Sequence, residues 1–447
     1  MNRTSRLSGF AIVPDHLPRR LAIAFWGWSW ATDCQPGEMF HDLDAAFRGL
    51  VERGFNTVRI DALWSWAFDR EGRRRGPIEL AGLAEPGYAN LIPGFGAAGG
   101  GRFDALDRLL HLLDVATRYG VNVALTSWEY QPGHSAGFLA DPALRADVIG
   151  VPPDARYPHL AAQCDRLISE IKRQGLEKCI AYVEVHNEAD YSAMRDLPGG
   201  LAAGRAATEK ALAFLRGRHP DLLFTDDYQV DVHTDGIFDY NTALRCLDKY
   251  AANAQLLDHH LYCGGGVQGA LFKAAGLQQW PTLTDAEITR LASENELYAW
   301  LLRPGSPTYL EYKQHFKSDW FKSWWPLIYL FQNMDVDRYD YWLFCHYPEW
   351  EERMRTFWRN YIQVLGQHAR QRNLPIVCDE GYLFWPPMHS HFEPSAVGRS
   401  NFEFIVNQML EQDYWGYMVS TYTLPDQPLC TTEAAWLKKI NEHILSA

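Results

Sequence analysis

The chain has 447 residues, of which 47% are hydrophobic, and its formal net charge is −13. This composition allows a large buried core, and α/β barrels often hold a chain of this length as one unit. The acidic balance, without a long basic run, argues against a nucleic-acid partner, because phosphate binding needs concentrated positive charge. No segment is long and apolar enough to span a bilayer, so we expect no membrane partner.

The cysteines and the N-terminal residues bear on cofactors and location. The eight cysteines are scattered, with no CxxC pair and no Cys/His cluster at zinc spacing, so we predict no metal site. The first predicted strand is not followed by a glycine-rich phosphate turn, and we predict no cofactor. Residues 1–20 lack the apolar run of a signal peptide, which predicts a cytoplasmic protein.

Strand-like and helix-like segments alternate in the first half of the chain. The apolar run at 21–29 (LAIAFWGWS) predicts a buried strand, and apolar residues at i, i+3 and i+4 in 41–53 predict an amphipathic helix. The alternation continues with predicted strands at 55–61, 121–129 and 180–188 and predicted helices at 103–119, 158–174 and 201–218.

The alternation is interrupted once in the second half. Residues 263–349 are rich in Trp and Tyr and read as a long insertion, which we expect to pack near the face that carries the functional residues. Around this insertion we predict strands at 222–226, 255–262, 374–380 and 415–422 and helices at 241–253, 350–372, 399–412 and 432–445.

Eight strand–helix units in series predict a parallel sheet, because each crossover helix returns the chain to the same end. Eight such units close naturally into a barrel. We therefore predict an α/β fold, a (β/α)8 TIM barrel, formed by residues 1–447 as a single domain, with 263–349 inserted between the sixth strand and the sixth helix. The alternative is an open doubly wound sheet, which usually carries a glycine-rich turn after its first strand.

Acidic residues end the fourth and seventh predicted strands, at Glu188 and Glu380. Functional side chains of a barrel collect at these ends. Two facing carboxyl groups are what glycoside hydrolysis needs, one protonated to release the leaving group and one ionised to attack. Asp379 is an alternative acid, but side chains alternate along a strand, so only one of Asp379 and Glu380 should point inward.

The residues around these acids resemble motifs of clan A glycoside hydrolases, the superfamily of cellulases, mannanases and many β-glycosidases. The pair Asn187-Glu188 resembles the end of strand four in that clan, where the Glu is the acid/base and the Asn binds the sugar 2-hydroxyl. Glu380 matches the nucleophile that ends strand seven. Ala189 replaces the Pro that often follows the acid/base, which puts little in doubt.

Two further matches point to the cellulase-like branch. Arg59 corresponds to an Arg on strand two that supports the nucleophile, and His260-Leu261-Tyr262 corresponds to a His-x-Tyr on strand six. The resemblance covers most of the barrel, from about residue 21 to the C-terminus, but not the insertion. The eighth strand lacks the Trp that many clan members use as the floor of the −1 subsite, and Tyr422 or Trp385 is a candidate replacement.

Polar and aromatic residues near the strand ends are candidate sugar-binding groups, since Trp and Tyr rings stack on sugar faces as well as pack cores. Arg59 could instead pair with Asp61 or Glu184 inside the barrel, and His260 could be a core histidine. The full candidate set is Arg59, Asp61, Trp30, Trp128, His186, Asn187, His260, Tyr262 and Trp385.

The resemblance implies a retaining double displacement on a β-linked oligosaccharide or glycoside. Glu188 would protonate the glycosidic oxygen while Glu380 attacks the anomeric carbon, and Glu188 would then deprotonate a water. Two alternatives stay open: a catalytically inactive carbohydrate-binding barrel and a transglycosylase that uses the same residues. The sequence leaves the sugar and the oligomeric state undetermined.

Overall fold

The computed structural model describes most of the chain, and all structural statements below refer to these residues. They are residues 13–82, 85, 100–131, 135–227, 252–262, 266–317, 322, 324–383, 386–387 and 389–447.

Eight strands form one sheet in the order β7-β6-β5-β2-β1-β10-β9-β8, and each neighbouring pair is parallel. The two ends of this sheet approach each other, since the Gln255 backbone N–H donates to the Phe224 carbonyl at 2.9 Å. The expected (β/α)8 TIM barrel is therefore confirmed. The strands are β1 (Leu21–Gly27), β2 (Thr57–Asp61), β5 (Asn122–Thr126), β6 (Ile180–Glu184), β7 (Phe224–Thr225), β8 (Leu257–Tyr262), β9 (Ile376–Tyr382) and β10 (Gly416–Met418).

The strands are short apolar runs because both of their faces are covered. Every residue of β1 and of β2 is buried, which is typical of a parallel sheet with side chains packed inside and helices outside. Arg59 and Asp61 of β2 are buried like their neighbours, but they are charged. They therefore need partners inside the barrel.

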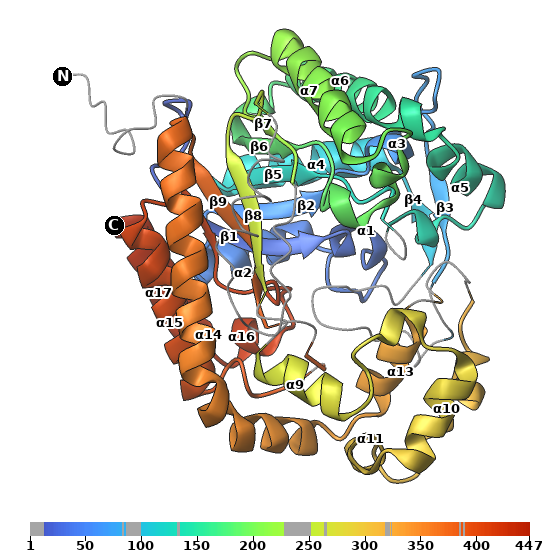
Figure 1. Ribbon diagram of the computed structural model, residues 1–447. Helices are drawn as coiled ribbons and strands as arrows, with labels where there is room; N and C mark the ends of the chain where they lie inside the picture. The colour runs from blue at the N-terminus through green and yellow to red at the C-terminus, as the bar shows by residue number, and fades with distance from the viewer. Residues whose placement is uncertain are drawn as a thin grey trace.

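Helices surround the sheet on the outside (Figure 1). Asp42 and Asp104 cap the first turns of α2 and α4 by accepting from backbone N–H groups, and Gly120 ends α4 with φ 67°. Apart from the predicted helices at 241–253 and 350–372, the predicted helices are confirmed with shifted bounds. The outer helices are α2 (Leu43–Glu52), α4 (Ala105–Tyr119), α6 (Arg156–Arg173), α7 (Gly200–Arg218), α14 (Val336–Arg372), α15 (Ala396–Glu411) and α17 (Ala434–Ser446).

The segment between β8 and α14 is itself helical, and its helices gather in the lower part of Figure 1, apart from α6 and α7. They are α9 (Val267–Ala274), α10 (Asp285–Glu294), α11 (Glu296–Leu301), α12 (Tyr309–Lys313) and α13 (Trp325–Asn333). Smaller elements decorate the barrel: α1 (Ser29–Thr32), α3 (Trp64–Ala67), α5 (Pro142–Ile149), α16 (Pro428–Thr431), and the antiparallel pair β3 (Ile78–Leu80) and β4 (Gly101–Phe103).

One predicted boundary is wrong. The helix expected to begin at residue 350 begins at Val336, capped by the Asp335 side chain, and it continues through Pro348. Tyr339, Leu343 and Tyr347 are buried at helical spacing along this first part, so aromatic residues assigned to the end of the insertion form an apolar face of the helix. The predicted helix at 241–253 falls almost entirely outside the described residues.

None of the helices in the described parts of the chain combines the length and the apolar character needed to cross a lipid bilayer.

Candidate active site

Glu188 and Glu380 approach each other where β6 and β9 end. Glu380 lies within β9, and Glu188 follows β6 in a left-handed conformation, with φ 44° and ψ 54°. That conformation is costly for a residue other than glycine and persists where the surroundings hold it. One oxygen of each carboxyl group and one nitrogen of His260 all lie within 4.8 Å of one another.

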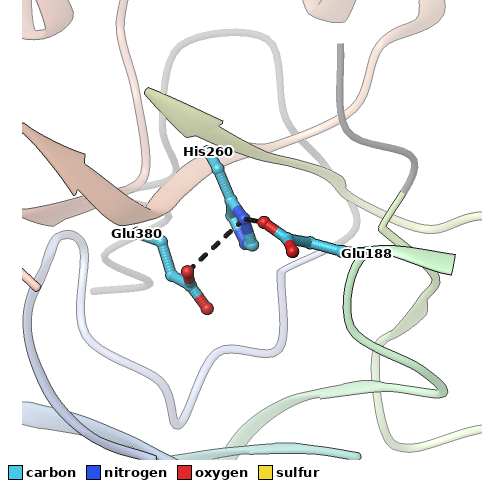
Figure 2. A group of neighbouring side chains, drawn as sticks. All are labelled: Glu188, His260 and Glu380. Atoms are coloured by element: carbon cyan, nitrogen blue, oxygen red, sulfur yellow. Dashed lines mark hydrogen bonds and ion pairs between the residues drawn. The ribbon is translucent and has the colours of Figure 1, made fainter. Parts of the chain in front are cut away.

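His260, from β8, stands between the two glutamates (Figure 2). Its Nδ1 lies 2.8 Å from Glu188 Oε1 and 3.6 Å from Glu380 Oε2. Its Nε2 faces two other carboxyl groups, with Asp379 Oδ1 at 3.5 Å and Asp227 Oδ2 at 3.6 Å. Burial lowers the pKa of this imidazole, but the surrounding carboxyl groups outweigh burial and raise the pKa well above its ordinary value.

Arg59 supplies a permanent positive charge to the same site. Its guanidinium lies 2.5 Å from Glu380 Oε1, 2.5 Å from Glu184 Oε2 and 2.8 Å from Asp379 Oδ2. Burial lowers the pKa of Arg59, and the three carboxylates raise it further than burial lowers it. The Trp128 ring packs 4.8 Å from the guanidinium carbon. The sequence left open whether Arg59 pairs with Glu184 or supports Glu380, and the structure shows that it does both.

The expectation that only one of Asp379 and Glu380 points inward is wrong. Along the β8–β9 ladder His259 pairs with Cys378 and His260 pairs with Glu380, so Asp379 is an extra residue in β9. Such a bulge breaks the alternation of side chains. Both carboxyl groups therefore reach Arg59. Burial raises the pKa of Asp379, but Arg59 and His260 outweigh burial and hold the pKa below its ordinary value.

Tyr262 completes the contacts of Glu380. Its hydroxyl donates to Glu380 Oε2 at 2.8 Å and lies 3.1 Å from the Thr421 hydroxyl. Burial raises the pKa of Glu380, and the positive charges of His260 and Arg59 oppose that rise without cancelling it. The side chains of Glu188 and Glu380 are 19% and 8% exposed, whereas those of Arg59 and His260 are fully buried. Of these four side chains, the two acids are the ones that solvent reaches.

Gln131 belongs to this site, although no sequence motif indicated it. Its amide nitrogen donates to Glu188 Oε2 at 3.0 Å, and its amide oxygen accepts from Asn187 at 3.3 Å. Asn187 in turn accepts from Arg59 at 2.5 Å. The only local signal is the position of Gln131, two residues beyond Glu129 at the end of a predicted strand. Gln131 and Asn187 thus connect the acid/base candidate to the guanidinium.

The other predicted binding residues contact protein groups, and their roles in sugar binding stay predictions. Trp30 is fully buried and donates from Nε1 to the Asp61 carbonyl at 2.9 Å. Asp61 is fully buried and accepts from the Leu63 N–H at 3.0 Å. His186 stacks against Tyr130, with ring centroids 6.0 Å apart. Trp385 lies outside the described residues.

Among the residues that the structure describes, two groups of side chains have the spacing to hold a metal ion. One is Glu188, His260 and Glu380, and the other is Glu184, Asp258 and Asp379, whose ligand atoms also lie within 4.8 Å of one another. In the second group Arg59 already makes ion pairs with Glu184 and Asp379. The guanidinium therefore provides the positive charge that a buried carboxyl cluster requires.

Comparison with known proteins shows which part of the chain resembles a described family. The family model described as "Cellulase-like: Sugar-binding cellulase-like" matches residues 23–74, which include β1 and β2. The resemblance to cellulase-like proteins is confirmed. This cellulase-like region carries Arg59, while the two glutamates lie beyond the matched residues. None of the curated proteins matches the sequence significantly.

Solved structures share the fold. A protein from Parabacteroides distasonis, provisionally described as a glycoside hydrolase, superposes with a TM-score of 0.59 at 17% identity, covering 95% of this chain and 93% of that one. A glycoside hydrolase family 5 mannosidase from Rhizomucor miehei gives a TM-score of 0.46 at 10% identity, covering 98% and 94% of the two chains. The first comparison shows a common fold. The chemistry has to be argued from the site itself.

Proposed function

We propose that the chain is a retaining glycoside hydrolase that cleaves β-glycosidic bonds of oligosaccharides or glycosides. The observation that carries this proposal is the approach of the Glu188 and Glu380 oxygens to within 4.8 Å. Retaining glycosidases hold their two carboxyl groups about 5 Å apart, whereas inverting enzymes need roughly 6.5–9.5 Å to admit a water between them.

In the first step Glu380 attacks the anomeric carbon while Glu188 protonates the departing glycosidic oxygen. Arg59 and Tyr262 each bond one oxygen of Glu380, so the attacking carboxylate is oriented and its negative charge is stabilised. Burial raises the pKa of Glu380, so these two donors matter for keeping an ionised fraction at neutral pH.

In the second step Glu188 removes a proton from a water that attacks the glycosyl–enzyme bond. His260 contacts Glu188 at 2.8 Å and faces Asp379 and Asp227 with its other nitrogen. If the Nε2–H points toward these acids, Nδ1 is left to share a proton with Glu188. His260 thus positions the acid/base and stays in reach of its proton in both steps.

The test is a panel of nitrophenyl β-glycosides, with the anomeric configuration of the released sugar followed by NMR. We expect hydrolysis of at least one glycoside with retained configuration. Inverted product would reject the double displacement, and binding without release would favour a non-catalytic carbohydrate-binding barrel. Transfer to added sugar acceptors in excess of hydrolysis would identify a transglycosylase.

Glu188→Ala and Glu380→Ala are the matched inactive variants for this panel. Each should abolish release while leaving the thermal unfolding transition in place, and near-normal turnover by either variant would reject the assignment. The cytoplasmic location and the packing of residues 263–349 near the barrel mouth remain predictions that belong to this proposal.

A further inference from the structure

A small pocket lies between the segment after β9 and the segment after β10. One side is lined by Pro386, Pro387, His389, Ser390, Glu393 and Pro394, and the other side is lined by Tyr422, Gln427, Pro428 and Leu429. The pocket has a volume of about 20 Å³, enough for one water-sized group, which needs roughly 10–15 Å³. Four prolines line it together with Glu393, Tyr422 and Leu429. Because proline fixes its own backbone angle, the walls are held in shape.

Glu393 brings an unused hydrogen-bonding atom to this pocket. The residue is 4% exposed, and its Oε2 accepts from the Ser420 hydroxyl at 3.1 Å. The Leu383 backbone N–H also bonds the carboxyl group. Its Oε1 is buried and has no hydrogen-bond partner among the described residues. A buried polar atom without a partner is costly, and because Glu393 lines the pocket, a group bound there is a candidate partner for this oxygen.

The pocket is connected to the catalytic residues through three consecutive residues. Ser420 donates to Glu393, Thr421 lies 3.1 Å from the Tyr262 hydroxyl, and Tyr422 lines the pocket. Tyr262 donates directly to the proposed nucleophile. Burial and Glu380 raise the pKa of the Tyr262 hydroxyl, and Tyr422 is close enough to add to that rise. A group held at Glu393 would therefore be linked to the proposed nucleophile through Ser420, Thr421 and Tyr262.

The protonation of Glu393 indicates what kind of group fits. Burial raises the pKa of this carboxyl to about 8, so it is largely uncharged at neutral pH. An uncharged carboxyl offers an O–H donor and an acceptor but no charge to attract an ammonium group. A sugar hydroxyl, which both donates and accepts, matches this site, and an amino sugar does not.

We propose that this pocket is a specificity subsite that holds one hydroxyl group of the bound sugar, and that Glu393 is the residue to which that hydroxyl bonds. The inference rests on the proposed glycoside hydrolase function and extends it. It names Glu393, which lies outside the strand-end motifs, as a determinant of which sugar is accepted.

The test pairs Glu393 variants with substrates that each lack one hydroxyl. A nitrophenyl β-glycoside that the wild type hydrolyses is compared with its monodeoxy analogues, using the wild type, Glu393→Gln and Glu393→Ala. For one deoxy position the wild type should lose about 10–100-fold in kcat/KM, because the buried carboxyl is then left unpaired. Glu393→Ala should have a kcat/KM on the full substrate that is lower than that of the wild type by a similar factor. Replacing the full substrate by that one analogue should then lower the kcat/KM of this variant almost no further.

Controls separate a lost contact from a damaged fold. Glu352→Gln removes a carboxylate from an exposed position on α14 and should match the wild type on every substrate. Glu393→Gln keeps the shape of the side chain, so it guards against a folding failure of the Ala variant. The proposal would be overturned if the Glu393 variants lost the same factor in kcat/KM on every deoxy analogue. It would also be overturned if they lost nothing on any substrate.

The subsite can also be tested by binding if the protein hydrolyses none of the glycosides. Calorimetric titration of the wild type with the parent glycoside and its deoxy analogues makes the same comparison by affinity. Absent turnover would then reject the proposed function, whereas equal affinity losses across the analogues would reject the subsite. A hydroxyl-specific loss that disappears in Glu393→Ala supports the subsite in either experiment.

Discussion

Buried carboxyl groups lie near the C-terminal ends of strands in two parts of this barrel, and the two parts differ in the charges that surround these groups. Around Arg59 the carboxylates of Glu184, Asp379 and Glu380 share one guanidinium. The second part is the pair of Asp61 and Glu129, at the ends of β2 and β5. Asp61 accepts from the Leu63 N–H at 3.0 Å and Glu129 from the Ser65 N–H at 2.7 Å.

The two parts differ in the charges that act on their carboxyl groups. Burial and the neighbouring Glu129 raise the pKa of Asp61 well above its ordinary value, and burial raises the pKa of Glu129. In the first part burial also raises the pKa values of Glu184 and Glu380, but Arg59 and His260 oppose that rise, and they hold the pKa of Asp379 below its ordinary value. A carboxyl group at a strand end is thus available as a charged reagent only where a cation shares its site.

The largest expected effect tests this contrast in activity. Glu380→Gln should lower kcat/KM by about 10³-fold or more, because it removes the attacking carboxylate. Glu129→Gln should change kcat/KM by less than about tenfold, because an amide resembles the protonated acid that burial favours there. Steady-state kinetics on the best nitrophenyl glycoside gives both numbers. An equal loss in the two variants would mean that the second pair also takes part in chemistry.

A smaller effect is expected in stability. Arg59→Met leaves buried carboxylates without their cation and should lower the free energy of unfolding by about 3–5 kcal/mol at pH 7. Asp61→Asn should cost less than about 1 kcal/mol, since that carboxyl already tends to be protonated. Urea unfolding measures both variants. The Arg59→Met deficit should shrink at pH 5 as the carboxyl groups take up protons, and a deficit independent of pH would contradict the electrostatic explanation.

The smallest effect concerns the pH profile. Glu380 must be ionised to attack, and its pKa is raised, so kcat/KM should fall on acidification at a pH above 4.5, the ordinary value. Tyr262→Phe removes a donor to the carboxylate and should move this acidic limb to higher pH by up to about one unit. Tyr298→Phe, in α11, is the control and should leave the limb in place. A shift to lower pH in Tyr262→Phe would show that the hydroxyl favours the protonated acid.

Much of the fold could be predicted because its signals are local. Apolar runs such as residues 21–29 and the amphipathic spacing of 41–53 depend on near neighbours in the chain, and both became the expected elements. The start of α14 differs from the prediction because its buried aromatic residues continue the Trp- and Tyr-rich composition of the predicted insertion at 263–349. Their i, i+4 spacing from Tyr339 to Tyr347 was the signal that would have extended the helix to Val336.

In the candidate site, too, some residues could be predicted from the sequence and others could not. The order of motifs along the chain was enough to select Glu188 and Glu380, since parallel strands bring their C-terminal ends together. The place of Gln131 beside Glu188 could not be predicted, because no spacing rule connects a residue beyond one strand with an acid beyond another. The inward turn of Asp379 depends on a bulge that forms only when β9 pairs with β8.

The sequence by itself determined the parallel barrel and which two acids lie near the C-terminal ends of its fourth and seventh strands, because burial patterns and strand ends are properties of short segments. Only the tertiary structure decided which charges those acids meet. Arg59, His260 and Asp379 come from three different strands, and their mutual distances follow from register and closure of the sheet rather than from any local pattern. Electrostatic energies depend on those distances and on burial, so the chemistry of the site is settled in three dimensions.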